Sequence, residues 1–164
     1  MSSGAAVTSC AGQLFLVFRV RQERFALAAT EIAEVLARLP LKPIARAPEW
    51  VAGVFAHRGQ MIPVLDVSAL TFGEPAVART STRLVLVNYP GNRLLGLILE
   101  HASDTLRCRP EEFRPYGLDN RATPYLGPVR EDSEGLLQRV EVAALLDERA
   151  RALLFAADEE GKAP

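Results

Sequence analysis

Several residue types are scarce in this chain, and each scarcity argues against a class of protein. There are two cysteines among 164 residues, Cys10 and Cys108, isolated from each other and without metal-ligand spacing. This usage fits a reducing compartment. The formal net charge is −1, so there is no basic excess to favour nucleic acid or an anionic membrane surface. No apolar run approaches transmembrane length, and Met1–Gly12 lacks the features of a secretory signal.

The residues that catalysis or phosphate binding would need are also scarce. The two histidines, His57 and His101, have no suitably spaced partner. No glycine-rich phosphate loop and no G-x-S-x-G motif is present. Cys108 lies between two arginines, which could lower the pKa of a thiol, but without an activating histidine an inert thiol is the simpler interpretation. We therefore expect no enzyme, no cofactor and no metal site.

What the chain does contain is a series of short apolar segments separated by turn residues. Alternating apolar residues, often β-branched or aromatic, predict β-strands. Many short strands with frequent turns favour a mainly β fold of barrels or a sandwich. The predicted strands are Leu14–Arg21, Phe25–Ala28, Val51–Phe55, Met61–Val67, Arg83–Tyr89, Arg93–Leu99, Ala102–Arg107, Val129–Arg130 and Leu136–Val142.

Two segments have the period of a helix instead. In Thr30–Leu39 the apolar residues recur at i, i+3, i+4 and i+7, which predicts a short amphipathic helix. A second apolar stripe runs from Val142 to Leu153. Pro48 can open a single helical turn. Between these segments, Arg109–Pro128 is rich in proline, so we expect a long surface loop.

The two ends of the chain differ in composition from the rest. Residues 1–12 and 157–164 are small or polar, and we expect both tails to be disordered. The remaining residues, 13–156, are enough for one domain of ordinary size with a sizeable core.

The stretch Trp50–Asp66, WVAGVFAHRGQMIPVLD, predicts a hairpin around which the chain is organised. Gly59 can supply a positive φ in its turn. Pro63 has no N–H to donate, so its strand is expected at a sheet edge or at a bulge. Arg58 is not needed to form the hairpin, and is either a solvated turn residue or a functional cation. Asp66 follows the second strand, a position typical of a hydrogen-bond acceptor.

The order of these segments carries a family resemblance. An apolar pair after glycine, then R-G, then P-V-x-D, is preceded and followed by matching strands. The chain thereby resembles the CheW family, the coupling proteins of bacterial chemotaxis-type signalling arrays, and within it the Wsp-type branch that serves surface sensing. It departs from the family pattern at Ala56-His57, where Asn-Leu is usual, and at Glu100, where aspartate is commoner. The matching residues are Phe15–Phe18, Phe25–Leu27, Glu34–Leu36, Ile44, Pro48–Val54, Arg58–Asp66, Arg83–Asn88, Leu95–Leu99 and Leu136–Leu146.

The resemblance implies a fold and a function. The fold would be two packed, small, five-stranded SH3-like β-barrels with one or two short helices. The function would be that of a non-catalytic adaptor without a cofactor. It would couple the cytoplasmic tips of chemoreceptors, the methyl-accepting chemotaxis proteins, to the regulatory domain of a CheA-type histidine kinase. Such a protein would be cytoplasmic and associated with membrane-bound receptor arrays, without inserting into the membrane.

The resemblance also implies two binding surfaces. Glu34 and Arg58 match family positions that form a charged pair beside a groove for the helical receptor tip, and Phe55 is a further candidate for the floor of that groove. The expected receptor-binding residues are Ile32, Glu34, Val35, Val54 and Arg58. The expected kinase-binding residues are Leu95, Leu97, Leu99 and Gly91, although the three leucines fit a buried core equally well.

Two other interpretations stay open at this point. A single-stranded nucleic-acid module of OB-like shape would need a basic groove and exposed stacking aromatics, and the charge balance speaks against it. A small enzyme could use His57, Arg58 and Asp66, which lie close together in the sequence, but no nucleophile accompanies them.

Overall fold

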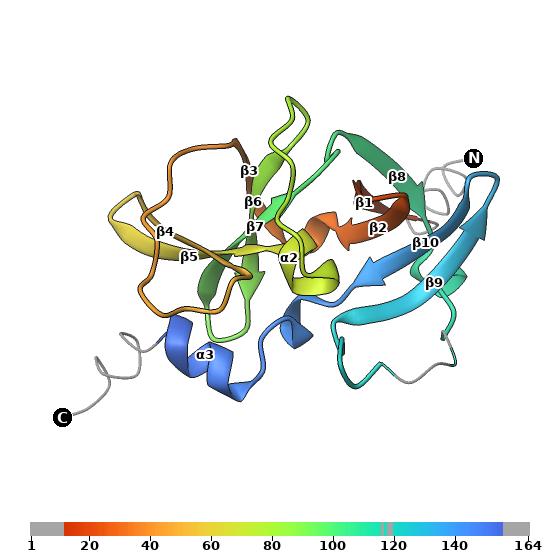
Figure 1. The fold of residues 1–164 in the computed structure, drawn as a ribbon. Helices are drawn as coiled ribbons and strands as arrows, with labels where there is room; N and C mark the ends of the chain where they lie inside the picture. The colour runs from red at the N-terminus through yellow and green to blue at the C-terminus, as the bar shows by residue number, and fades with distance from the viewer. Residues whose placement is uncertain (1–11, 116, 118–119, 156–164) are drawn as a thin grey trace, which may run out of the picture.

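The computed structural model describes residues 12–115, 117 and 120–155, and these form a mainly β protein of two five-stranded sheets. Sheet A has the strand order β8-β1-β2-β10-β9, and sheet B has the order β3-β6-β7-β5-β4. Figure 1 shows the two sheets side by side, with α2 between them and α3 beneath sheet B. The strands are β1 Gln13–Val20, β2 Glu23–Ala28, β3 Ile32–Ala37, β4 Val51–His57, β5 Gln60–Asp66, β6 Arg83–Tyr89, β7 Arg93–Leu99, β8 Asp104–Cys108, β9 Leu126–Asp132 and β10 Gly135–Val140.

Short helices connect or cover the sheets. They are α2 Val67–Phe72, α3 Glu148–Leu154 and the 3-10 turns Ala29–Glu31, Pro110–Glu112 and Val142–Ala144. The chain starts sheet A with β1 and β2, builds the whole of sheet B with β3 to β7, and returns to sheet A with β8 to β10. The expected mainly β fold of two packed five-stranded units is confirmed, and sheet A is assembled from two separate parts of the chain.

The buried side chains form three clusters, and alternate residues of one strand can belong to different clusters. On β1, Leu16 and Phe18 point into a large cluster shared by both sheets, whereas Phe15 and Val17 point into a cluster within sheet A. Both faces of β1 are therefore buried in its middle, and its polar residues, Gln13 and Arg19, lie towards the two ends of the strand. A third cluster lies within sheet B and contains Phe55, Ile62, Val64, Leu84 and Leu86.

The predicted helix over Thr30–Leu39 is wrong. After a 3-10 turn the chain forms β3, which pairs antiparallel with β6. The pairing shifts register between Ile32 and Glu34, so one extra residue stands in β3 at a bulge. The bulge places Ile32 and Val35 on one face of the strand and Glu34 and Leu36 on the other. The 3.6-residue spacing of the apolar residues is thus also compatible with a bulged strand.

The predicted second helical stripe is divided, and one helix was not predicted. The stripe from Val142 to Leu153 is a 3-10 turn followed by α3. The additional helix is α2, which directly follows β5. Asp66 caps α2 by accepting a hydrogen bond from the backbone N–H of Ala69 at 3.1 Å, and its other carboxylate oxygen accepts from the N–H of Ala76, in the loop after α2, at 2.9 Å. The expected acceptor role of Asp66 is confirmed.

Pro63 lies neither at a sheet edge nor at a bulge, because β5 is paired with β4 on one side and with β7 on the other. Its neighbour across β4 is Val54, whose N–H and C=O both bond to Lys42 on the opposite side. No hydrogen bond from Pro63 to Val54 is required, and the pairing of β5 with β7 begins only at Val64, so the missing N–H leaves no ladder hydrogen bond unmade.

The described residues of the segment 109–128 form more structure than a plain surface loop would. It contains a 3-10 turn, a backbone bridge between Arg114 and Val129, and the buried rings of Phe113 and Tyr125. Of the tails expected to be disordered, residues 1–11 and 157–164 lie outside the described residues.

Candidate partner-binding surface

The Glu34 carboxylate joins the two edge strands of sheet B. Glu34 lies on β3, and its Oε1 accepts a hydrogen bond from His57 Nε2 at the end of β4, at 3.1 Å. Its Oε2 lies 3.5 Å from Arg58 Nη2 in the following turn. The Arg58 side chain is 77% exposed and that of Glu34 is 31% exposed. The charged pair that the resemblance implied is present, and His57 adds a second partner that sequence reasoning missed.

The hairpin turn explains where Arg58 points. Arg58 and Gly59 have φ values of +51° and +79°, as expected for the two central residues of a tight hairpin turn. The predicted positive φ of Gly59 is confirmed. With its backbone at the tip of the hairpin, Arg58 directs its guanidinium away from the sheet and into solvent, apart from the contact with Glu34.

Three predicted apolar residues lie on the face of sheet B that points away from the sheet's own cluster. Ile32 and Val35 are paired with Val87 and Val85, whose side chains belong to the cluster shared by both sheets. Val35 is 47% exposed, whereas Ile32 and Val54 are partly buried. These residues provide apolar surface on the two edge strands of sheet B, and on β3 Ile32 and Val35 lie on the opposite face from Glu34.

Two residues of the β4–β5 hairpin change the predicted surface. Phe55 is buried in the cluster within sheet B, so it does not form part of a groove floor. Met61 is 62% exposed and follows the hairpin turn by one residue. It lies on the same strand face as Pro63 and thus as its cross-strand neighbour Val54. Sequence reasoning placed Met61 in a strand without recognising that its side chain is exposed.

The leucines predicted to bind the kinase are core residues. Leu95, Leu97 and Leu99 are at most 1% exposed and lie in the cluster shared by both sheets. Their assignment to a partner surface is wrong, because a partner cannot reach them in the folded protein. Gly91 is exposed in the β6–β7 turn, with φ +91°.

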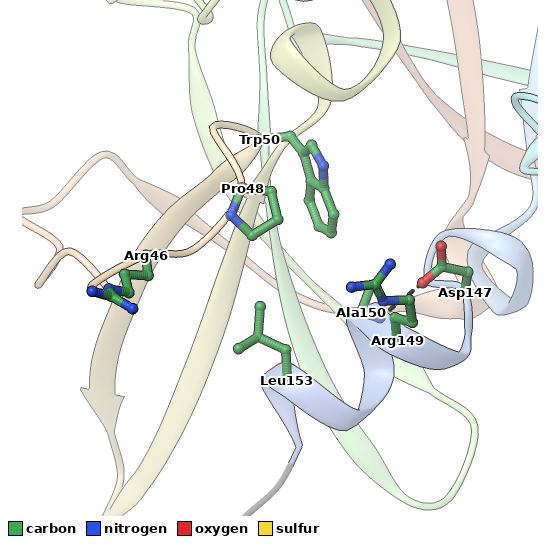
Figure 2. A pocket seen from close by; sticks show the side chains of 7 residues that line it. All are labelled: Arg46, Pro48, Trp50, Asp147, Arg149, Ala150 and Leu153. Atoms are coloured by element: carbon green, nitrogen blue, oxygen red, sulfur yellow. Dashed lines mark hydrogen bonds between the residues drawn. The ribbon is translucent and has the colours of Figure 1, made fainter.

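A groove that was not predicted lies between α3 and the loop before β4. It has a volume of about 460 Å³ and is lined by Arg46, Pro48, Trp50, Asp147, Arg149, Ala150 and Leu153. Figure 2 shows Pro48 and Trp50 on one side of the groove and the residues of α3 on the other. Asp147 caps α3 by accepting from Ala150 N–H at 2.8 Å. The proline and the apolar stripe were visible in the sequence, but nothing in the sequence indicated that they lie side by side.

The structure does not support the alternative enzyme or the nucleic-acid module. Asp66 lies at the far end of β5 from the hairpin turn, roughly 20 Å away along the strand, and its carboxylate already accepts two backbone hydrogen bonds. Burial raises the pKa of the Cys108 thiol, which opposes reactivity. The rings of Phe15, Phe18 and Phe25 are buried and offer no platform for bases.

Within the described residues, no group of three or more His, Cys, Asp or Glu side chains could hold a metal ion. The same part of the chain contains no helix with the length and apolar character needed to cross a membrane.

Comparisons with known proteins agree with this fold. The family model described as the CheW-like domain matches residues 14–150. Chemotaxis protein CheW of Klebsiella aerogenes is 28% identical over 145 residues, which cover 87% of each chain. Protein FrzA of Myxococcus xanthus is 32% identical over 121 residues, which cover 72% of this chain and 74% of that protein.

The crystal structure of the scaffolding protein TtCheW from Thermoanaerobacter tengcongensis superposes with a TM-score of 0.76, at 18% identity, over 85% of this chain and 90% of that one. This likeness confirms the CheW-like fold expected from the sequence. None of these relatives distinguishes the Wsp-type branch, so that assignment stays a prediction. The match across residues 14–150 establishes that the chain belongs to the CheW-like domain family.

Proposed function

We propose that this protein is a non-catalytic adaptor that couples chemoreceptors to a CheA-type histidine kinase in a chemotaxis-type signalling array. The observation that carries the proposal is the family match over residues 14–150, together with relatives that are named chemotaxis proteins. Both five-stranded sheets of the fold are complete in the described residues. An adaptor of this kind would work in the cytoplasm, beside membrane-bound receptors.

The receptor surface in this proposal is the group of Glu34, His57 and Arg58 with the apolar side chains of Val35 and Val54. A helical receptor tip would place apolar residues on the valines and a polar residue near the arginine. The Arg58–Glu34 pair is exposed and 3.5 Å long, so it contributes only about 0–1 kcal/mol to the free energy of unfolding. An interface arginine that loses its solvent can contribute about 2 kcal/mol or more to binding.

The kinase surface in this proposal is the exposed β6–β7 turn around Gly91. The buried leucines of β7 hold this turn in place but do not reach a partner. The turn lies beside Tyr89, whose ring stacks on Phe155 with centroids 5.6 Å apart. The turn is therefore firmly supported, as a docking site for a second domain requires.

Calorimetry with two variants tests both surfaces. Arg58→Ala should weaken binding to a purified receptor-tip fragment about tenfold or more, with nearly unchanged melting temperature. It should leave binding to the CheA-type regulatory domain intact.

Asn92→Asp is the matched variant in the β6–β7 turn, because Asp tolerates the φ of +59° found there. It should weaken binding to the regulatory domain and leave receptor binding intact.

The outcomes separate the parts of the proposal. If wild type binds neither partner at high micromolar concentration, the adaptor function is wrong for these partners. If wild type binds both and the folded Arg58→Ala protein binds the receptor fragment equally well, the role of Arg58 is wrong. If Asn92→Asp changes nothing, the kinase contact lies elsewhere.

A further inference from the structure

His57 lies in the same charged group as Arg58, but its surroundings are different. Its side chain is 18% exposed, compared with 77% for Arg58. Its Nε2 is 3.1 Å from Glu34 Oε1, and its ring centroid lies 5.8 Å from that of Phe55. The imidazole is therefore held between a buried aromatic ring and the Glu34 carboxylate, behind the exposed arginine.

The groups that face His57 come from three elements. Glu34 approaches from β3, Arg58 follows His57 in the turn, and Phe55 precedes it on β4. Across the hairpin, its register partner on β5 is Gln60, which carries no charge. Among these neighbours, Glu34 carries a negative charge and Arg58 a positive charge, and His57 and Arg58 both contact the Glu34 carboxylate.

His57 and Arg58 use different oxygens of that carboxylate. His57 occupies Oε1, and Arg58 lies nearest to Oε2. When Arg58 moves away from Glu34, the carboxylate keeps one hydrogen-bond donor and its side-chain position. In a protein with leucine at this position, which the resemblance gives as the usual residue, Glu34 would lose its only other partner in this group.

We propose that His57 is a positioning residue that holds Glu34 in place and so releases Arg58 to bind a carboxylate on the partner helix. This proposal rests on the proposed receptor-binding function and specifies the partner chemistry: an acidic side chain beside an apolar stripe.

The test uses the full chain and a purified receptor-tip fragment, and it compares the dissociation constants of wild type, His57→Gln and His57→Leu. His57→Gln keeps an N–H donor for Glu34 and should bind the fragment like wild type. His57→Leu cannot hold Glu34 and should bind about two- to fivefold more weakly, the size expected for an exposed charge interaction.

A second readout needs no partner. The carboxylate ¹³C signal of Glu34 in the free protein should move in His57→Leu, where the donor is lost, and should stay near its wild-type position in His57→Gln. Equal binding of the receptor fragment by wild type and folded His57→Leu would overturn the proposal, as would a Glu34 signal that is the same in both proteins. If the Glu34 signal responds but neither wild type nor any variant binds the receptor fragment, the receptor function fails and only the His57–Glu34 contact stands.

Discussion

At the scale of single residues, the strongest charged contact lies far from the proposed receptor surface. Arg24 on β2 is buried, and its guanidinium donates to both carboxylate oxygens of Asp132, at 2.8 and 3.0 Å. This bidentate pair connects β2 to the end of β9. The hydrogen bond from Arg24 is the main reason why the pKa of Asp132 falls from 3.8 to about 2.

This shift predicts how stability depends on pH. Because the pKa of Asp132 is lower in the folded than in the unfolded protein, its stabilising contribution is complete above the unfolded value and is lost as the pH falls through about 4 to about 2. The contribution is about 2 kcal/mol of unfolding free energy. Urea unfolding of wild type and Asp132→Asn should show the variant less stable at neutral pH and the difference shrinking in acid. A difference that stays constant down to pH 2 would contradict this account.

Gly53 on β4 makes a second prediction for a single residue. A Cβ at Gly53 would lie 2.6 Å from the backbone oxygen of Lys42, and its φ is +148°. Gly73 also has positive φ, +77°, but a Cβ there would meet nothing within 4 Å. Both substitutions to alanine carry a conformational cost, and Gly53→Ala should cost about 1–3 kcal/mol more because backbone must move. Equal losses of unfolding free energy for the two variants would rule out the steric argument.

At the scale of elements, α3 depends on a single capping side chain. Asp147 accepts from the N–H of Ala150 at 2.8 Å, and α3 brings Ala150 into the shared cluster. Asp147→Ala should lower the unfolding free energy by about 1 kcal/mol, with hydrogen exchange of the α3 amides increasing most. Glu148→Ala, one residue further along, is the control and should lose less stability, because Glu148 is exposed and only its charge favours the first turn of α3. If both variants lose the same stability, the cap is not the cause.

The elements also show how far the sequence could be read. Strands with clear alternation, such as β6 and β7, were predictable because their pattern is local and their turn is strong. The segment that forms β3 was not, because its apolar spacing fits a helix, and only pairing with β6, about 50 residues later, makes it a strand. In the candidate site, too, the contacts that form only between distant strands were not predicted. The Glu34–Arg58 pair could be predicted from the family resemblance, whereas the place of His57 depends on two strand edges that meet only in the fold.

At the scale of the whole molecule, the two sheets cannot be separated along the chain. Sheet B is built entirely from residues between β2 and β8 of sheet A. The parallel pairing of β2 with β10 then joins the first and last parts of the chain in one sheet. The cluster shared by both sheets includes Phe18 and Phe25 from sheet A and Leu97 from sheet B. The family resemblance implied two units, but the strand pattern did not predict this connectivity, because alternation within a strand does not reveal which sheet the strand joins.

The shared cluster predicts a single unfolding transition. Leu97→Ala removes apolar volume between the sheets and should cost about 2–5 kcal/mol. Leu137→Ala, in the cluster within sheet A, is the matched variant, because both leucines are at most 1% exposed. Trp50, the one tryptophan of the chain, packs against the shared cluster and reports on sheet B by fluorescence. Hydrogen exchange of β9 and β10 reports on sheet A.

Because the sheets share the cluster and the chain threads through both, the fluorescence and exchange midpoints should coincide in each variant. A Leu137→Ala protein that loses exchange protection in sheet A while Trp50 keeps its native midpoint would show that the sheets unfold independently. Coincident midpoints would mean that a ligand on sheet B stabilises sheet A as well, since binding energy is shared throughout one cooperative unit. For the proposed adaptor, a receptor tip bound at Arg58 would then stabilise the whole molecule against unfolding.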